Sequence, residues 1–173
     1  MEVESVGQAD WEHRLRDLVV ANVDHDLVLI DCPPSLVHLT VMALSAADQV
    51  LVPMQCEYFA LEGISELVST IRRVQAGPNP RLALGGVLLT MYDDRTKLSK
   101  EVADEVRRHF GPLVFQSVGP RSIRLAEAPS HGQPISMYDR ESRGAIAYLG
   151  LAGEMIRRER GGAPMQINPA HVN

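Results

Sequence analysis

The chain has 173 residues, 45% of them apolar, and a formal net charge of −5 at pH 7. This length and composition predict one soluble domain with its own core and exclude a disordered chain. The negative charge excludes a protein that coats nucleic acid over its whole surface, although it leaves a local basic patch open. The two cysteines form neither a disulfide framework nor a metal-binding pattern.

The sequence contains none of the signals that direct a chain to a membrane. No apolar run is long enough to cross a bilayer. Glu2, Glu4 and Asp10 stand where a secretory signal would have a basic start and an apolar block. We therefore expect a cytoplasmic protein without a membrane partner.

The first predicted elements are a helix and a buried strand. Residues 8–22 place Trp11, Leu15 and Leu18 on one helical stripe. The segment 26–31 is too short for a helix and is followed by a Pro-Pro stop, which predicts a buried parallel strand with Asp31 at its carboxyl edge. Open α/β sheets bind their ligands at this edge.

Helices and strands alternate through the rest of the chain. The predicted elements are a helix at 36–47, a strand at 49–53, a helix at 57–75, a strand at 81–90, a helix at 97–110, a strand at 114–118, a short helix at 122–128 and a final helix at 141–158. This order predicts an α/β fold with a mainly parallel sheet and helices on both faces. Residues 1–160 are expected to form one domain, and 161–173, which contain turn formers and no periodicity, a flexible tail.

Asp31 is the strongest candidate for a metal-binding residue. In phosphate-handling proteins an acid at such a strand end holds Mg²⁺ or its water shell, beside a Gly-rich loop that ends in Gly-Lys-Ser/Thr. The chain contains no such loop, because its two lysines, Lys97 and Lys100, do not follow a glycine. The sequence is therefore typical of the second half of a nucleotide-binding domain. The alternative for Asp31 is a cap of the following helix.

Four segments together resemble ParA/Soj-type chromosome and plasmid partitioning ATPases. They are DCPPS at 31–35, PMQCEYFALEG at 53–63, GVLLTMYD at 86–93 and EAPSHGQPI at 127–135, and the family's order holds over residues 8–158. DCPP alone leaves the wider deviant P-loop class open, including its MinD-like and nitrogenase iron protein-like branches. The resemblance implies a P-loop NTPase-like fold, here truncated on its N-terminal side. It also implies an ATP- and Mg²⁺-dependent homodimer that binds DNA nonspecifically and releases it after hydrolysis stimulated by a ParB-like partner.

The resemblance assigns four residues to the nucleotide base. They close the third and fourth predicted strands, so all of them should lie on the same edge of the sheet: Thr90, Met91, Pro120 and Arg121. In the family these positions surround adenine, where a thioether and a proline ring supply flat apolar walls. The alternative is ordinary packing at strand ends.

Two arginines match positions that the family uses to contact DNA. Arg95 and Arg124 each follow a predicted strand end, where a guanidinium can reach a phosphate oxygen without entering a groove. Such binding is independent of base sequence and sensitive to salt. The alternative is a solvated surface charge, because fifteen arginines against two lysines also fit a genomic bias toward G and C. A catalytic role for His131 beside Ser130 is less well supported than a turn.

The sequence thus predicts a nucleoid-associated partitioning protein of the ParA/Soj type, represented by its C-terminal portion. Without a phosphate-binding loop the chain is not expected to hydrolyse ATP at a useful rate. The alternative function is a non-catalytic truncated module that regulates a full-length partition ATPase. Because the missing elements would lie centrally in the sheet, we expect the isolated chain to aggregate or to depend on a partner.

Overall fold

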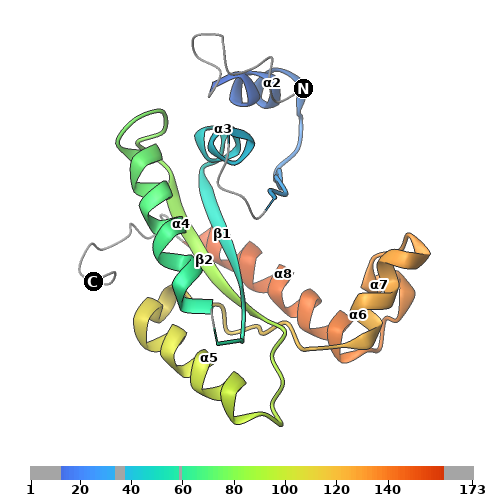
Figure 1. Ribbon diagram of the computed structural model, residues 1–173. Helices are drawn as coiled ribbons and strands as arrows, with labels where there is room; N and C mark the ends of the chain where they lie inside the picture. Colours follow the sequence, from blue (N-terminus) through green and yellow to red (C-terminus); the bar gives the residue numbers. More distant parts are fainter. Residues whose placement is uncertain (1–12, 34–37, 59, 162–173) are drawn as a thin grey trace. The chain divides into compact units, whose positions relative to one another are not determined.

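The computed structural model describes residues 13–33, 38–58 and 60–161 (Figure 1). The chain forms two compact units. Unit 1 contains residues 1–50 and 64–83, and unit 2 contains residues 51–63 and 84–173. The start of the first predicted helix, with Trp11, and the predicted tail from residue 162 lie outside the described residues.

Unit 1 is built from helices. They are α2 (Arg14–Asn22), α3 (His38–Ala46) and, from residue 64 on, α4 (Ala60–Gln75). Helices α2 and α3 pack on each other. The second half of α4 buries one apolar stripe formed by Val68, Ile71 and Val74. This spacing of three residues is the one that places side chains on one face of a helix, and it explains why the predicted helix forms.

A buried amide fixes the end of unit 1. Asn79, which is 2% exposed, donates through Nδ2 to the carbonyl oxygens of Leu44 (3.0 Å) and Ala47 (2.7 Å). These carbonyls lie at the C-terminal end of α3, where a helix has no internal donors for its last turn. The stretch after α4 that contains Asn79 therefore caps α3.

The predicted strand at 26–31 is wrong. These residues form no strand, and the side chains of the apolar run are exposed: Leu27 57%, Val28 40%, Leu29 74% and Ile30 37%. An apolar run becomes a buried parallel strand only when neighbouring strands accept and donate its backbone hydrogen bonds. Among the described residues no strand pairs with this segment, so its composition alone does not produce the strand.

The sheet consists of β1 (Gln49–Gln55) and β2 (Ala83–Thr90), and most of both strands belongs to unit 2. Backbone hydrogen bonds join Ala83 N to Asp48 O (3.0 Å) and Cys56 N to Thr90 O (2.9 Å). The residue numbers rise together along both strands, so the pairing is parallel. The two predicted strands are confirmed, and the α/β fold with them.

The segment predicted as a strand at 114–118 lies beside β2 without forming a continuous ladder. Phe115 N donates to Val87 O (2.9 Å) and Gly119 N donates to Leu89 O (2.8 Å). Isolated parallel bridges join Val114 to Val87 and Pro120 to Tyr92. Proline has no N–H to give to a ladder, which limits the pairing at the end of this segment.

Four α-helices complete the described part of unit 2. They are α5 (Lys97–Phe110), α6 (Ile123–Glu127), α7 (Ile135–Tyr138), which was not predicted, and α8 (Arg143–Gly161). The predicted bounds of α5 are confirmed. Its first turn is capped by Thr96 Oγ1, which accepts from Ser99 N (3.3 Å), and it ends at Gly111 with φ +51°. No described helix combines the length and apolar content needed to cross a membrane.

The core of unit 2 covers both faces of β2. On one face Leu88 packs with Phe115 and with Leu151 of α8. Val87 and Leu89 point to the opposite face, because side chains alternate along a strand, and both are fully buried. Burial on both faces is what a near-continuous apolar strand requires.

Candidate nucleotide-binding edge and arginine cluster

Backbone hydrogen bonds bring together the four residues predicted to surround a nucleotide base. Tyr92 N donates to Gly119 O (3.1 Å), and Arg121 N donates to Tyr92 O (2.9 Å). The parallel bridge between Tyr92 and Pro120 lies at the carboxyl end of β2. The pairs Thr90–Met91 and Pro120–Arg121 therefore lie beside each other on one sheet edge, as the sequence predicted.

Met91 adopts an uncommon backbone conformation at this edge. Its φ is +54°, in the left-handed region that side chains other than glycine rarely occupy. The conformation is held on either side, because Thr90 O accepts from Cys56 N and Tyr92 N donates to Gly119 O. Residues strained in this way cluster at ligand-binding sites. Met91 is also 37% exposed, so it can be reached from solvent.

The edge carries apolar surfaces and an arginine paired with an acid. The thioether of Met91 and the half-buried ring of Pro120 are apolar surfaces of the kind that pack on a flat ring. Arg121 is engaged by Glu57, with 2.9 Å between Nη2 and Oε1. The sequence supplies no lysine that follows a glycine, so the usual cradle for the phosphates is missing from these residues.

Asp31, the predicted magnesium ligand, lies in unit 1 outside any strand and is exposed. The neighbouring Cys32 donates its thiol hydrogen to Ile30 O (3.7 Å), and burial together with the charge of Asp31 raises the pKa of that thiol. Among the described residues no three His, Cys, Asp or Glu side chains gather into a metal site. Because Mg²⁺ is usually held by one or two carboxylates and the phosphates of its nucleotide, a single acid fits a supporting role only.

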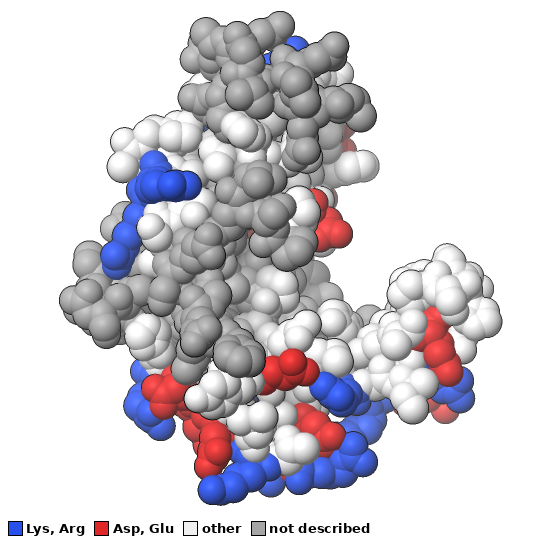
Figure 2. All heavy atoms as spheres, viewed as in Figure 1, with Lys and Arg blue, Asp and Glu red and all other residues white. Residues whose placement is uncertain are grey.

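Arg95 and Arg124, the predicted DNA contacts, both lie on the surface of unit 2. Arg95 precedes α5, and its side chain is 83% exposed. Arg124 lies on α6 and is 56% exposed. Figure 2 shows Lys and Arg side chains interspersed with Asp and Glu around α5. Both arginines can therefore be reached by a phosphate, although each has a carboxylate neighbour.

Comparison with known proteins shows which family this chain resembles. A family model described as an AAA domain matches residues 1–84. The chromosome partitioning protein ParA of Caulobacter vibrioides is 53% identical over 163 residues, which is 92% of this chain and 61% of that protein. The sporulation initiation inhibitor protein Soj of Bacillus subtilis is 51% identical over 155 residues, 89% of this chain and 61% of that protein. The chain belongs to the ParA/Soj family.

A solved structure supports the same fold. Cobyrinic acid a,c-diamide synthase from Mycobacterium smegmatis, crystallised with bound ADP and magnesium, superposes with a TM-score of 0.76 at 35% identity. The match covers 97% of this chain and 62% of that one. The ParA/Soj chain therefore has the P-loop NTPase-like α/β fold, and it spans about three fifths of the length of the relatives it matches.

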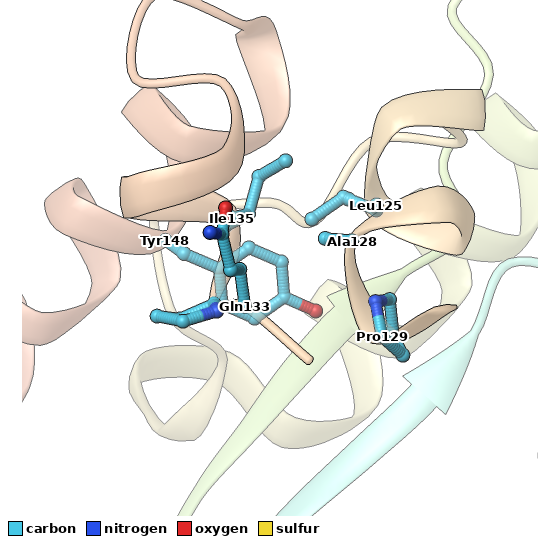
Figure 3. A pocket seen from close by; sticks show the side chains of 7 residues that line it. Leu125, Ala128, Pro129, Gln133, Ile135 and Tyr148 are labelled. Atoms are coloured by element: carbon cyan, nitrogen blue, oxygen red, sulfur yellow. The ribbon is translucent and has the colours of Figure 1, made fainter. Parts of the chain in front are cut away.

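A small pocket lies elsewhere in unit 2 of the ParA/Soj chain. It has a volume of about 160 Å³ and is lined by Leu125, Ala128, Pro129, Gln133, Pro134, Ile135 and Tyr148 (Figure 3). Ligand pockets for drug-sized molecules usually exceed about 300 Å³, so a nucleotide does not fit here. Nearby, His131 stacks on Tyr138 with ring centroids 4.8 Å apart. His131 thus packs on Tyr138, which fits the turn role predicted for His131.

Sequence reasoning missed a buried clamp on α8. Glu154 is 8% exposed and accepts from Gln116 N and Ser117 N, both at 2.9 Å, and from Arg158 Nη2 at 3.0 Å. Arg158 also donates to Val114 O (3.0 Å) and covers the ring of Phe115 at 3.9 Å. The i, i+4 spacing of this pair predicts an ordinary surface ion pair, and no local signal indicates that a neighbouring segment buries it. The clamp anchors the segment that leads to Pro120.

Proposed function

We propose that this chain is the base-binding and DNA-binding part of an ATP-dependent partitioning protein. In this proposal Met91 and Pro120, with Thr90 and Arg121, hold the adenine of ATP, and Arg95 and Arg124 hold DNA phosphates without reading base sequence. The observation that carries the proposal is the backbone pairing of Tyr92 with Gly119 and Arg121, which gathers the base-binding residues at one sheet edge. A nucleoid location, a ParB-like partner and a homodimer belong to the same proposal.

The 173 residues alone are proposed not to hydrolyse ATP. Asp31 would hold Mg²⁺ through a water molecule, and the nucleotide would supply the other ligands. The phosphate-binding loop provides most of the electrostatic stabilisation in phosphoryl transfer, so its absence should lower the rate by several powers of ten. A malachite-green phosphate assay on the purified chain tests this, and robust Mg²⁺-dependent turnover would contradict it.

Base binding can be tested without the phosphates. Saturation-transfer NMR with millimolar adenosine should give signals from the base protons in the wild-type chain. Met91→Ala combined with Pro120→Ala removes both apolar walls and should abolish those signals. Met137→Ala is the matched control, because Met137 is 73% exposed and lies outside the predicted edge. Equal signals from the double variant and the control would refute the assignment.

DNA binding can be tested by charge reversal. Arg95→Glu combined with Arg124→Glu should remove the retention of the chain on a random-sequence DNA column at low salt, because phosphate contacts supply nonspecific affinity. Arg107→Glu combined with Arg108→Glu makes the same change of net charge in the last turn of α5. This control should retain most of the binding. Loss of equal size in both variants would mean that only net charge matters.

A second candidate function is a non-catalytic module that pairs with a full-length partition ATPase. The exposed apolar run from Leu27 to Ile30 favours it, because contiguous exposed apolar surface is typical of interaction sites. Size-exclusion chromatography of the chain mixed with Caulobacter vibrioides ParA should then yield a mixed complex that Leu29→Asp weakens. A monomeric chain that melts cooperatively alone and ignores the added protein would contradict this alternative.

A further inference from the structure

The Arg95 guanidinium is already bound to a carboxylate of the same loop. Asp93 Oδ1 accepts from Arg95 N (3.0 Å) and Nε (2.9 Å), and Asp93 Oδ2 accepts from Nη2 (2.7 Å). The hydrogen bonds from Arg95 hold the pKa of Asp93 well below its usual range. The Asp93 side chain is only 14% exposed, whereas that of Arg95 is 83% exposed. The acid is therefore fixed beneath an arginine that faces solvent.

Other arginines of unit 2 have acidic neighbours of the same kind. Each of the following lies within hydrogen-bonding distance of a carboxylate oxygen: Arg121 with Glu57 (2.9 Å), Arg124 with Glu127 (3.1 Å) and Asp139 (3.4 Å), and Arg143 with Asp94 (3.3 Å). Glu127 also accepts from the hydroxyl of Tyr138 (3.2 Å), which fixes its position. The four arginines of this cluster, Arg95 included, thus face five carboxylates and carry no excess of positive charge.

We propose that the carboxylates beside Arg95, Arg124 and Arg143 compete with DNA phosphates for these three arginines, and that Asp93 is the strongest competitor. This inference rests on the proposed DNA-binding function. Nonspecific affinity comes from cations that replace the counterions of the DNA, and a guanidinium already neutralised by a carboxylate replaces few of them. Each of these arginines therefore contributes to DNA affinity only when it leaves its carboxylate partner and binds a phosphate instead.

Asp93 could either compete with a DNA phosphate for Arg95 or hold Arg95 in place for that phosphate. The negative charge of Asp93 decides which of these two effects is larger. The fork of Arg95 uses its Nε and Nη2 donors on Asp93, so a phosphate could still bind the remaining edge of the guanidinium. That phosphate would lie well within one Debye length of the Asp93 carboxylate, about 8 Å at physiological salt, and would be repelled. Phosphate contacts without base readout depend on net charge more than on fixed geometry. Competition is therefore the larger effect.

The test measures binding of the full 173-residue chain to a fluorescein-labelled 30-bp duplex by anisotropy at several salt concentrations. Asp93→Asn keeps an oxygen that can accept from Arg95 N, so the turn before α5 is preserved, and circular dichroism checks this. The variant should bind about two- to fivefold more tightly, the range that exposed ion pairs span. The salt dependence of log K should steepen by up to about 0.9 for the one arginine released.

Asp104→Asn is the matched control. Asp104 lies on α5 and is paired with Arg107 at 3.7 Å, so the same charge is removed outside the cluster. It should change the affinity and the salt slope clearly less than Asp93→Asn does, because the freed Arg107 lies outside the cluster. A combined Asp93→Asn and Asp94→Asn variant should exceed the single one, because Arg143 is then released as well.

The outcomes separate this inference from the proposed function. If Arg95→Glu with Arg124→Glu abolishes binding but Asp93→Asn behaves like Asp104→Asn, competition is refuted and DNA binding stands. If Asp93→Asn weakens binding at an unchanged salt slope, Asp93 positions Arg95 and the inference is again wrong. If neither the wild type nor Asp93→Asn binds the duplex, both ideas are overturned.

Discussion

Removing the buried acid of α8 should destabilise unit 2 strongly. Glu154→Ala deletes the acceptor of two backbone N–H groups, those of Gln116 and Ser117, and leaves Arg158 without its carboxylate. The side chains of Glu154 and Arg158 are 11% and 29% exposed, so water replaces the lost contacts poorly. The segment that leads to the predicted base-binding edge would lose its anchor.

The magnitude follows from the contacts that are lost. A hydrogen bond to a charged group contributes about 1.5 to 3 kcal/mol, and breaking a buried ion pair costs about 3 to 5 kcal/mol. These two figures describe overlapping contacts and are not added. We expect Glu154→Ala to lower the free energy of unfolding by about 3 to 5 kcal/mol. Glu154→Gln keeps one acceptor oxygen and should lower it by about 1 to 2 kcal/mol.

Urea unfolding followed by circular dichroism measures both variants, and the midpoint together with the slope gives the change in free energy. A loss below about 1 kcal/mol for Glu154→Ala would refute the clamp, because a loss that small is typical of a solvent-exposed pair. The midpoint should fall in the order wild type, Glu154→Gln, Glu154→Ala.

The same residue predicts how stability depends on pH. Burial alone would raise the pKa of Glu154, but the N–H groups of Gln116 and Ser117 and the guanidinium of Arg158 outweigh it and lower this pKa below 4.5. A carboxyl group whose pKa is lower in the folded state binds fewer protons there than when unfolded. It therefore stabilises the fold above about pH 4.5, and this contribution is lost as the pH falls through the folded pKa. In Glu154→Gln the free energy of unfolding should therefore depend less on pH in this acidic range. An unchanged pH dependence there would contradict the lowered pKa of Glu154.

Three further predictions concern packing, capping and thiol chemistry. Gly86→Ala would place a Cβ 2.3 Å from Cε2 of Phe115, so overpacking should lower stability by about 1 to 3 kcal/mol, and an unchanged melting temperature would contradict it. Thr96→Ala removes the cap of α5 and should cost about 1 kcal/mol in urea unfolding, whereas Thr96→Ser should restore most of it. Burial raises the pKa of the Cys56 thiol to about 11, so Cys56 should react with Ellman's reagent at pH 8 only after unfolding. Cys32 is exposed and should react in the native protein, more slowly than a free thiol because its pKa is also raised. Equal rates for Cys32 and Cys56 would refute this.

The predicted base-binding edge illustrates how far topology alone carries a prediction. Thr90 and Pro120 end two predicted strands, and strands that run in parallel end at one edge. The structure places these residues side by side through the Tyr92–Gly119 hydrogen bond. It also adds the left-handed backbone of Met91, which the sequence could not reveal because methionine has no preference for that conformation. The ion pairs of Arg95 and Arg124 were likewise not predicted.

Helix α5 is the element that the sequence determined by itself. Its cap at Thr96, its apolar stripe through Val102, Val106 and Phe110, and its stop at Gly111 act between residues a few positions apart, so local pattern is enough. Tertiary structure decided that residues 26–31 form no strand. Their apolar run predicts one, but no described strand pairs with them. Tertiary structure also decided the burial of Glu154 and the pairing of the arginines. Strand pairing and polar burial depend on residues distant in the sequence, and only the folded chain brings those residues together.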